Sequence, residues 1–289
     1  MAIQKSTFFP GIVAQEMFSS VQGHSALAKL AQNRPMPFNG TDIITFASSS
    51  EAAVVAEGAA KPAFAGSNNV IQMRPIKFVF GQRVNDEFRY AADEVRLNYL
   101  RGFADAFAKK IARGFDIAAM TGKDPQSASA VLSLATNNFH DVVTNVITAT
   151  AGAEDAAVQS AITALMGAGY QPDGIVMTPA MASALAAIKV NGVPQFPELA
   201  WGGNPERVNG LRSDITTALA FDSSADDSLV GDFANAFRWG YAKDIPMEVI
   251  EFGDPDGAGD LKRFNQVYLR AEAYIAWAIL DPNAFGIVK

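Results

Sequence analysis

The stretch Asp86–Thr121, DEFRYAADEVRLNYLRGFADAFAKKIARGFDIAAMT, carries the strongest helical pattern in the chain. Apolar side chains recur in it every three or four residues, the spacing of one helix face: Phe88, Ala92, Val95, Tyr99, Phe103, Phe107, Ile111 and Phe115. Asp86 and Glu87 suit the first turn of a helix, and Gly122 suits its end. At 1.5 Å per residue the helix would be roughly 50 Å long, which predicts a structural spine.

Two segments before this helix have the composition of strands, Thr41–Ala47 and Asn69–Asn85. The residues between them, Ser48–Asn68, are rich in Ala, Gly and Ser, so we expect a long hairpin with an extended tip. An isolated two-stranded hairpin is marginal in water and needs a partner surface. Residues 1–40 read as an extended arm with short helices at Ala14–Gln22 and Ser25–Gln32.

The remainder of the chain contains both helical and strand patterns. We expect helices at Glu154–Met166 and Pro179–Lys189, strands at Gly174–Met177, Ser228–Ala242 and Ile245–Phe252, and a long loop at Asn191–Gly210. The segment Phe264–Leu280 (FNQVYLRAEAYIAWAIL) alternates almost throughout, as a half-buried strand does.

The composition excludes several kinds of chemistry. The 289 residues include no Cys and two His, so disulfides, thiolate catalysis and a histidine-rich metal site are ruled out. No phosphate-binding glycine loop is present. Asp254, Asp256 and Asp260 lack the final Glu of a calcium loop, and like Asp226-Asp227 they read as solvated charges. We therefore expect no enzyme activity, no cofactor and no metal.

The net charge of −7 is unevenly distributed, because residues 1–123 carry +4 and residues 124–289 carry −11. The two segments can attract each other within one subunit or between copies, although the charge pattern taken alone favours an ordinary solubilising surface. No apolar run approaches the roughly 20 residues of a membrane helix, and no secretory signal is recognisable. We expect no association with membranes.

Several segments resemble the major capsid protein of tailed double-stranded DNA bacteriophages, in that family's order from about residue 35 to the end. They are the hairpin tip AEGAAKPAF (Ala56–Phe64) with its return strand, the helix Asp86–Thr121, GIVMTPAMASALAAIK (Gly174–Lys189), GDFANAFRWG (Gly231–Gly240) and FNQVYLRAEAYIAWAILDPNAF (Phe264–Phe285). The loops Asn191–Gly210 and Gly122–Ala135 do not match closely. The resemblance rests on the order and spacing of these segments more than on any single motif.

The resemblance implies a tailed-phage major capsid protein fold of the α+β class, with an arm, an extended loop, a spine helix and two domains. Transferred to this chain, it gives an N-terminal arm at 1–39, an extended hairpin loop at 40–85, a peripheral domain at 86–129 and 238–280, and an axial domain at 130–237 and 281–289. Arm and hairpin would both lie on neighbouring copies.

The same resemblance implies a structural protein that assembles as pentamers and hexamers into an icosahedral shell around phage double-stranded DNA. Its partners would be itself, a portal protein, a scaffold protein and, as a further candidate, a decoration protein, with DNA contacted without sequence specificity. Its location would be the virion, after assembly in the host cytoplasm. Members of that family often carry a scaffolding segment ahead of the arm; here the arm follows Met1, so either the scaffold is a separate protein or the sequence is a processed form, and the ordinary MAIQ start favours a separate scaffold.

Some members of that family join neighbouring subunits by an isopeptide bond. The resemblance places the nucleophile on Lys61, its target on Asn265 and the helping carboxylate on Glu272. Asn265 and Glu272 are seven residues apart, so on a regular strand they would face opposite ways at roughly 23 Å, and the three groups would have to meet between subunits. Alternatively, Lys61 makes an ordinary ion pair across an interface.

Two other functions remain open at this point. A cellular compartment shell of the encapsulin kind shares the fold that the resemblance implies. A soluble α/β enzyme or ligand-binding protein could instead use the loop Asn191–Gly210. The first would assemble like a capsid, whereas the second would be a monomer or a small oligomer with a pocket.

Overall fold

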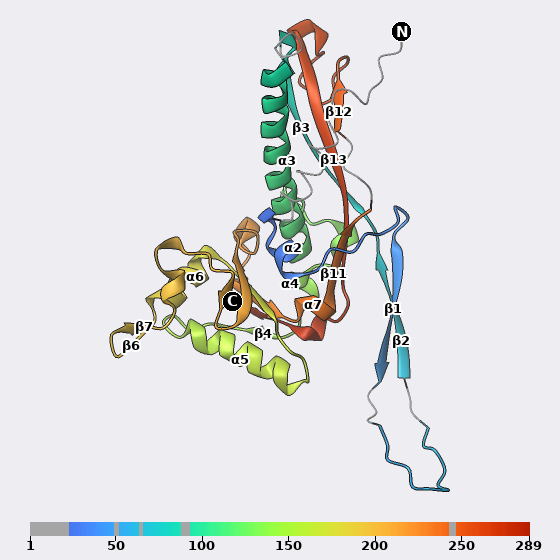
Figure 1. Ribbon diagram of the computed structural model, residues 1–289, viewed down its shortest axis with the longest axis vertical. Helices are drawn as coiled ribbons and strands as arrows, with labels where there is room; N and C mark the ends of the chain where they lie inside the picture. Colours follow the sequence, from blue (N-terminus) through green and yellow to red (C-terminus); the bar gives the residue numbers. More distant parts are fainter. Residues whose placement is uncertain (1–22, 49–51, 64–65, 88–92, 243–246) are drawn as a thin grey trace.

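The computed structural model describes residues 23–48, 52–63, 66–87, 93–242 and 247–289. The chain is of the α+β class, and three parts stand out in Figure 1. One long helix lies along a four-stranded sheet, a six-stranded sheet lies beside the lower end of that helix, and a two-stranded hairpin projects away from both.

The four-stranded sheet is organised around β13 (Gln266–Ile279). Along one edge β13 pairs with β3 (Ile76–Asn85), and along the other it pairs with β11 (Phe237–Tyr241) and β12 (Met247–Ile250), always antiparallel. Its side chains alternate as the sequence predicts, and one face is fully buried: Val267, Leu269, Ala271, Ala273, Ile275 and Trp277.

The spine helix α3 (Asp93–Thr121) packs against β3 and β13 through aromatic side chains. Phe103 and Phe107 contact Phe80, with ring centroids 6.0 and 6.4 Å apart. Phe115 contacts Trp277 at 5.4 Å. The 29 described residues span about 43 Å, and the helix ends at Gly122, whose φ of +70° is left-handed.

The start of this helix differs from the prediction. Asp86 and Glu87 lie in a 3-10 turn after β3 instead of in the first turn of α3, and residues 88–92 lie outside the described part of the chain. The predicted apolar stripe is buried only in its later part, because Val95 and Tyr99 are 59% and 37% exposed. The early turns of α3 therefore extend beyond the part of the surface that the described residues bury.

The single strand predicted at Asn69–Asn85 is wrong, because the chain forms two strands there. β2 (Gly66–Met73) pairs with β1 (Thr41–Ser48), whereas β3 pairs with β13. Between them lies Pro75, which has no N–H to donate to a strand neighbour. The break lets one extended segment serve two separate sheets.

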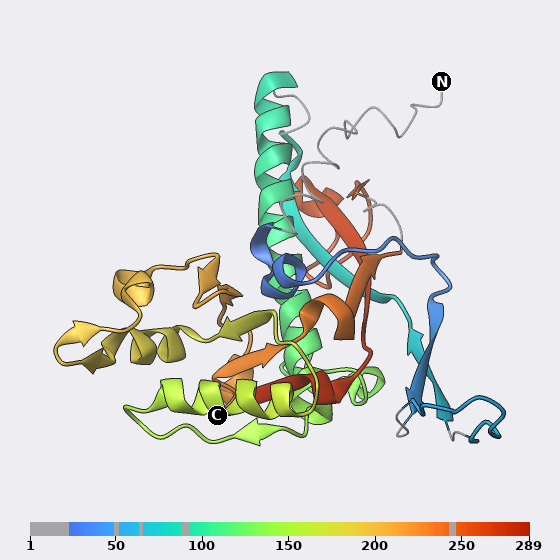
Figure 2. The same cartoon turned by 60° about the horizontal axis from the view of Figure 1, so that its bottom comes forward.

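The six-stranded sheet is mixed and has α5 (Glu154–Gly167) and α6 (Pro179–Ala187) beside it (Figure 2). Its order is β4 (Val146–Ile147), β14 (Phe285–Val288), β10 (Ser228–Gly231), β5 (Gly174–Met177), β9 (Leu211–Ile215) and β8 (Arg207–Val208). The β-rich segment predicted at Ser228–Ala242 is interrupted by α7 (Phe233–Ala236), so β10 and β11 belong to different sheets. The helix predicted to reach Lys189 ends at Ala187.

Short elements complete the described chain. They are α2 (Ala26–Leu30), η3 (Leu132–Leu134), α4 (Phe139–Val142), β6 (Lys189–Val190), β7 (Val193–Pro194), η4 (Pro197–Gly202), η5 (Phe221–Ser223), η6 (Lys262–Phe264) and η7 (Pro282–Ala284). The predicted helix Ser25–Gln32 is confirmed as α2, whereas Ala14–Gln22 lies outside the described residues. None of the described helices combines the length and the apolarity that crossing a membrane requires.

After α2 the chain runs in extended form against β11. The Arg34 N–H donates to the carbonyl of Trp239 at 3.0 Å, and the Met36 N–H donates to that of Tyr241 at 3.3 Å. Gly240 lies between these two contacts, and a Cβ added there would collide with the carbonyl oxygen of Arg34. The close approach of the two backbones therefore requires glycine.

We expect Gly240→Ala to destabilise the subunit by about 1–3 kcal/mol, because the collision is with backbone that cannot rotate away. Gly102→Ala is the control, since nothing lies within 4 Å of its added Cβ in α3. It should stabilise the subunit by up to about 1 kcal/mol through helix propensity. Urea unfolding measures both, and equal midpoints for the two variants would contradict this account of β11.

Candidate assembly surfaces

The hairpin β1–β2 presents apolar side chains to solvent. Ile44 is opposite Val70 in the register, so these two side chains and Phe46 share one face of the ribbon. They are 58%, 53% and 78% exposed. Within the described chain no third strand joins this sheet, and the tip residues 52–63 are exposed as well.

The base of the hairpin is held firmly, unlike its outer part. Met73 is buried with Ala276 and Ala278 of β13. Arg74 donates hydrogen bonds to the carbonyl oxygen of Asn39 at 2.7 Å and to the carboxylate of Asp42 at 2.9 Å. These contacts attach the base of the hairpin to the body, while its far end projects into solvent (Figure 1).

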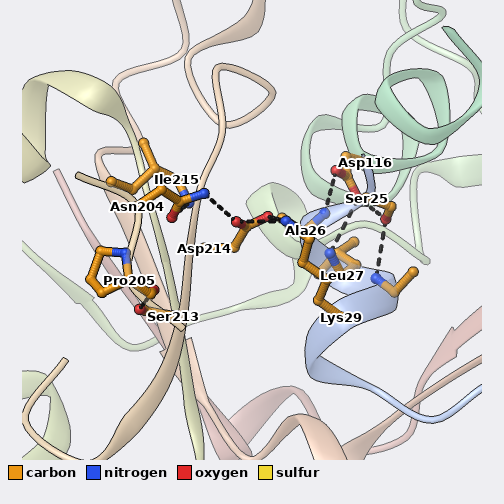
Figure 3. A network of polar contacts seen from close by, with 11 residues as sticks. Ser25, Ala26, Leu27, Lys29, Asp116, Asn204, Pro205, Ser213, Asp214 and Ile215 are labelled. Carbon is orange, nitrogen blue, oxygen red and sulfur yellow. Dashed lines mark hydrogen bonds and ion pairs between the residues drawn. The ribbon is translucent and has the colours of Figure 1, made fainter. Parts of the chain in front are cut away.

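A buried carboxylate joins α2 to the spine helix (Figure 3). Asp116 of α3 accepts hydrogen bonds from the Ser25 hydroxyl at 2.6 Å and from the backbone N–H groups of Ala26 and Leu27 at 2.8 and 3.3 Å. These donors are at the N-terminus of α2, which Ser25 also caps. Burial raises the pKa of Asp116 to about 7, although the hydrogen bonds oppose this shift.

A second polar contact joins α2 to the six-stranded sheet. Lys29 of α2 forms an ion pair with Asp214 of β9 at 2.9 Å. The amide of Asn204 donates to the same carboxylate at 2.8 Å and accepts from the Ile215 N–H at 3.2 Å. As Figure 3 shows, the short helix thus links the spine helix on one side with the sheet on the other.

The acidic turn after β12 is less solvated than the sequence predicts. Arg83 of β3 forms ion pairs with Asp254 and Asp256 and donates to the carbonyl of Gly259 at 2.7 Å. Hydrogen bonding to Arg83 lowers the pKa of Asp256 to about 2. One guanidinium therefore fixes this loop onto the four-stranded sheet.

The three residues of the candidate cross-link lie in separate parts of the structure. Lys61 is in the exposed hairpin tip, and Glu272 is in the middle of β13. The sequence predicts Asn265 on the same strand as Glu272, but Asn265 lies just before β13 with a left-handed backbone conformation. Glu272 pairs with Lys77 at 2.7 Å and accepts from the Tyr274 hydroxyl at 3.1 Å; the hydrogen bond from Lys77 is the main cause that lowers its pKa.

The structure contains a buried charge cluster that the sequence does not indicate. Asp226 is 1% exposed and lies 2.7 Å from His140 Nδ1 and 3.4 Å from Lys289 Nζ. The expectation that Asp226 is a solvated loop charge is therefore wrong, because its carboxylate is buried against His140 and Lys289, which are distant from it in the sequence. Among the described residues no group of three or more His, Cys, Asp or Glu could hold a metal ion.

Comparison with known proteins identifies relatives. The sequence matches the model of the Phage capsid family over residues 9–289. A solved chain from Mycobacterium phage Ogopogo is 27% identical with a TM-score of 0.77, covering 92% of this chain and 91% of that one. A chain from Gordonia phage Cozz is 23% identical with a TM-score of 0.70, covering 91% and 85%.

A chain from the capsid of an empty GTA particle is 19% identical with a TM-score of 0.66, covering 92% of this chain and 89% of that chain, and shares the fold. Among curated proteins the comparison finds no match.

Asp116 makes stability depend on pH. Its ordinary pKa is 3.8 and its folded pKa is about 7, so between these values the folded protein holds a proton that the unfolded chain releases. Stability contributed by this group therefore falls as pH rises through that window. Asp116→Asn cannot titrate at this position. Relative to this variant, the free energy of unfolding of the wild type should fall by on the order of 1 kcal/mol for each pH unit within that window. Urea unfolding of unassembled subunits measures this, and parallel pH profiles would contradict it.

Proposed function

Because the chain belongs to the phage capsid family, we propose that its copies cover one another's exposed surfaces as pentamers and hexamers of an icosahedral shell. The protein is a structural major capsid protein, and its place is the virion. A structural role follows from the family, and we infer that the chain has no enzymatic activity of its own. An encapsulin-like compartment or an α/β enzyme is not favoured by these relatives.

The observation that carries the proposal is the uncovered apolar face of the hairpin. Ile44, Phe46 and Val70 lie beyond the part of β1–β2 that contacts β13, where the described residues provide no second layer. Fully burying a side chain of this size contributes about 1.5–3 kcal/mol. A neighbouring copy that packed on this face would both order the hairpin and gain that free energy.

Each part of the chain then has a place in the shell. We assign residues 1–39 to the arm, 40–85 to the extended loop, 86–129 and 238–280 to the peripheral domain, and 130–237 and 281–289 to the axial domain. The spine helix and β13 support the first of these domains, and the six-stranded sheet supports the second. Arg74 at the hairpin base would set the direction of the contact with the next copy.

The further partners follow from the same role. We propose that the shell encloses phage double-stranded DNA without reading its sequence, receives it through a portal protein and forms around a scaffold protein. A decoration protein is a further candidate partner. Assembly would occur in the host cytoplasm.

We propose that Lys61 acts through a non-covalent contact rather than an isopeptide bond. To form the isopeptide bond, the Lys61 amine would attack the Asn265 side-chain amide and release ammonia. A base must first take a proton from that amine. Glu272 is the candidate base, but Lys77 already holds it as a carboxylate whose pKa is lowered. A carboxylate with a lowered pKa is a poor proton acceptor.

Phe46→Asp should prevent shell formation, because it places a charge on the face that we expect a neighbour to cover. The free energy of unfolding of the subunit should stay within about 0.5 kcal/mol of the wild-type value, since Phe46 is 78% exposed. Ser67→Asp is the matched control, because Ser67 is on the opposite face of the ribbon and also exposed. Sedimentation and electron microscopy measure assembly, and equal yields of shells from both variants would contradict the proposal.

Denaturing gel electrophoresis of mature shells distinguishes the two roles of Lys61. A non-covalent contact predicts one band at 30.7 kDa. A ladder at multiples of that mass, lost in Lys61→Arg, would show that the bond forms.

A further inference from the structure

One tryptophan projects from the molecule with no cover. Trp201, in η4, is 104% exposed, whereas Trp239 and Trp277 are 0% exposed. Its backbone is left-handed, with φ 58° and ψ 27°. This conformation is unfavourable for a bulky residue by roughly 1–2 kcal/mol. A strained backbone that presents an indole to water is typical of a contact that forms with another molecule.

The same part of the fold contains an apolar groove of about 590 Å³ between α5 and the β8–β9 hairpin. Ile162, Ile175 and Leu211 line it, and Met166 beside them is 63% exposed. Gln159 supplies a polar side chain. An indole suits these surroundings, because its ring needs apolar and thioether contacts and its N–H needs an acceptor once it is buried.

Trp201 and the groove lie on different sides of α6. Leu185 of α6 lines the groove, whereas Ala182 and Ala186 line a separate hollow together with Trp201. Figures 1 and 2 both place α6 and α5 in the part of the molecule that extends away from the spine helix. A projection and a groove on different sides of one domain suit head-to-tail contacts, which form a ring when the rotation between successive copies closes.

We propose that Trp201 of one copy inserts into the groove between α5 and β8–β9 of the next copy in the ring. This proposal rests on the proposed function, since it requires that copies of the chain assemble. It names Trp201 as the residue that holds one of the contacts between neighbouring copies together. The tryptophan occupies the groove, and the remaining surface of each domain surrounds it and excludes water.

Iodide quenching of tryptophan fluorescence tests this directly, because Trp239 and Trp277 are buried and Trp201 alone is exposed. In unassembled subunits iodide should quench the Trp201 emission, and in purified wild-type shells this quenching should be lost with a shift of the emission to shorter wavelength. Sedimentation of the same samples reports assembly independently. Emission from the two buried indoles reports whether the subunit is folded.

Met166→Lys tests the groove without disturbing the core, because the side chain is largely exposed. It should weaken association of subunits about tenfold or more and leave Trp201 open to iodide. Leu132→Lys is the matched control, since Leu132 is 94% exposed and does not line the groove, and it should keep Trp201 protected in shells. Trp201→Ala should weaken association as Met166→Lys does, whereas Trp201→Phe should restore part of it.

Wild-type shells in which iodide still quenches Trp201 would overturn this inference and leave the proposed function intact. Shells of Met166→Lys that protect Trp201 as the wild type does would also overturn it, because another surface would then cover the indole. A wild-type protein that never assembles would overturn the proposed function, and this inference with it.

Discussion

A two-stranded ribbon cannot bury its own side chains, and this constraint governs the whole molecule. β1 and β2 pair over eight residues each, yet only the base near Met73 contacts the body. Beyond that base, the described residues leave Ile44, Phe46 and Val70 exposed, while ordering the ribbon still costs conformational entropy. Under the proposed function, the free energy that orders the outer part of the hairpin comes from a neighbouring copy in the shell.

If neighbouring copies order the hairpin, as we propose, the rest of the subunit has to hold that hairpin in place. Asp116 ties α2 to the spine helix, and Lys29 ties it to β9 of the six-stranded sheet. β3 follows the hairpin, pairs with β13 along its whole length, and packs with β13 against the spine helix, which connects the hairpin base to that helix. Arg83 holds the acidic loop against that sheet. The protruding surfaces are therefore carried by elements that hydrogen bonds and packing join into one framework.

Local patterns made much of this fold predictable. The alternation in β13 and the stripe of α3 depend only on neighbouring residues; the alternation is confirmed, whereas the described stripe is buried only from Phe103 onward. Pro75 was a visible signal for the break between β2 and β3 that the alternation concealed. The partners of Asp116 and Arg83 lie about 90 and 170 residues away in the chain, so no local pattern could identify them. An acidic residue within the apolar stretch Gly114–Met120 was the one signal for Asp116.

Hydrogen exchange of the hairpin amides, compared between unassembled subunits and shells, tests most directly whether neighbours complete the chain. Our account predicts fast exchange in the outer part of β1–β2 before assembly and strong protection after it, with the amides of β13 protected in both states. A hairpin that is equally protected in the separate subunit, or equally open in the shell, would contradict it.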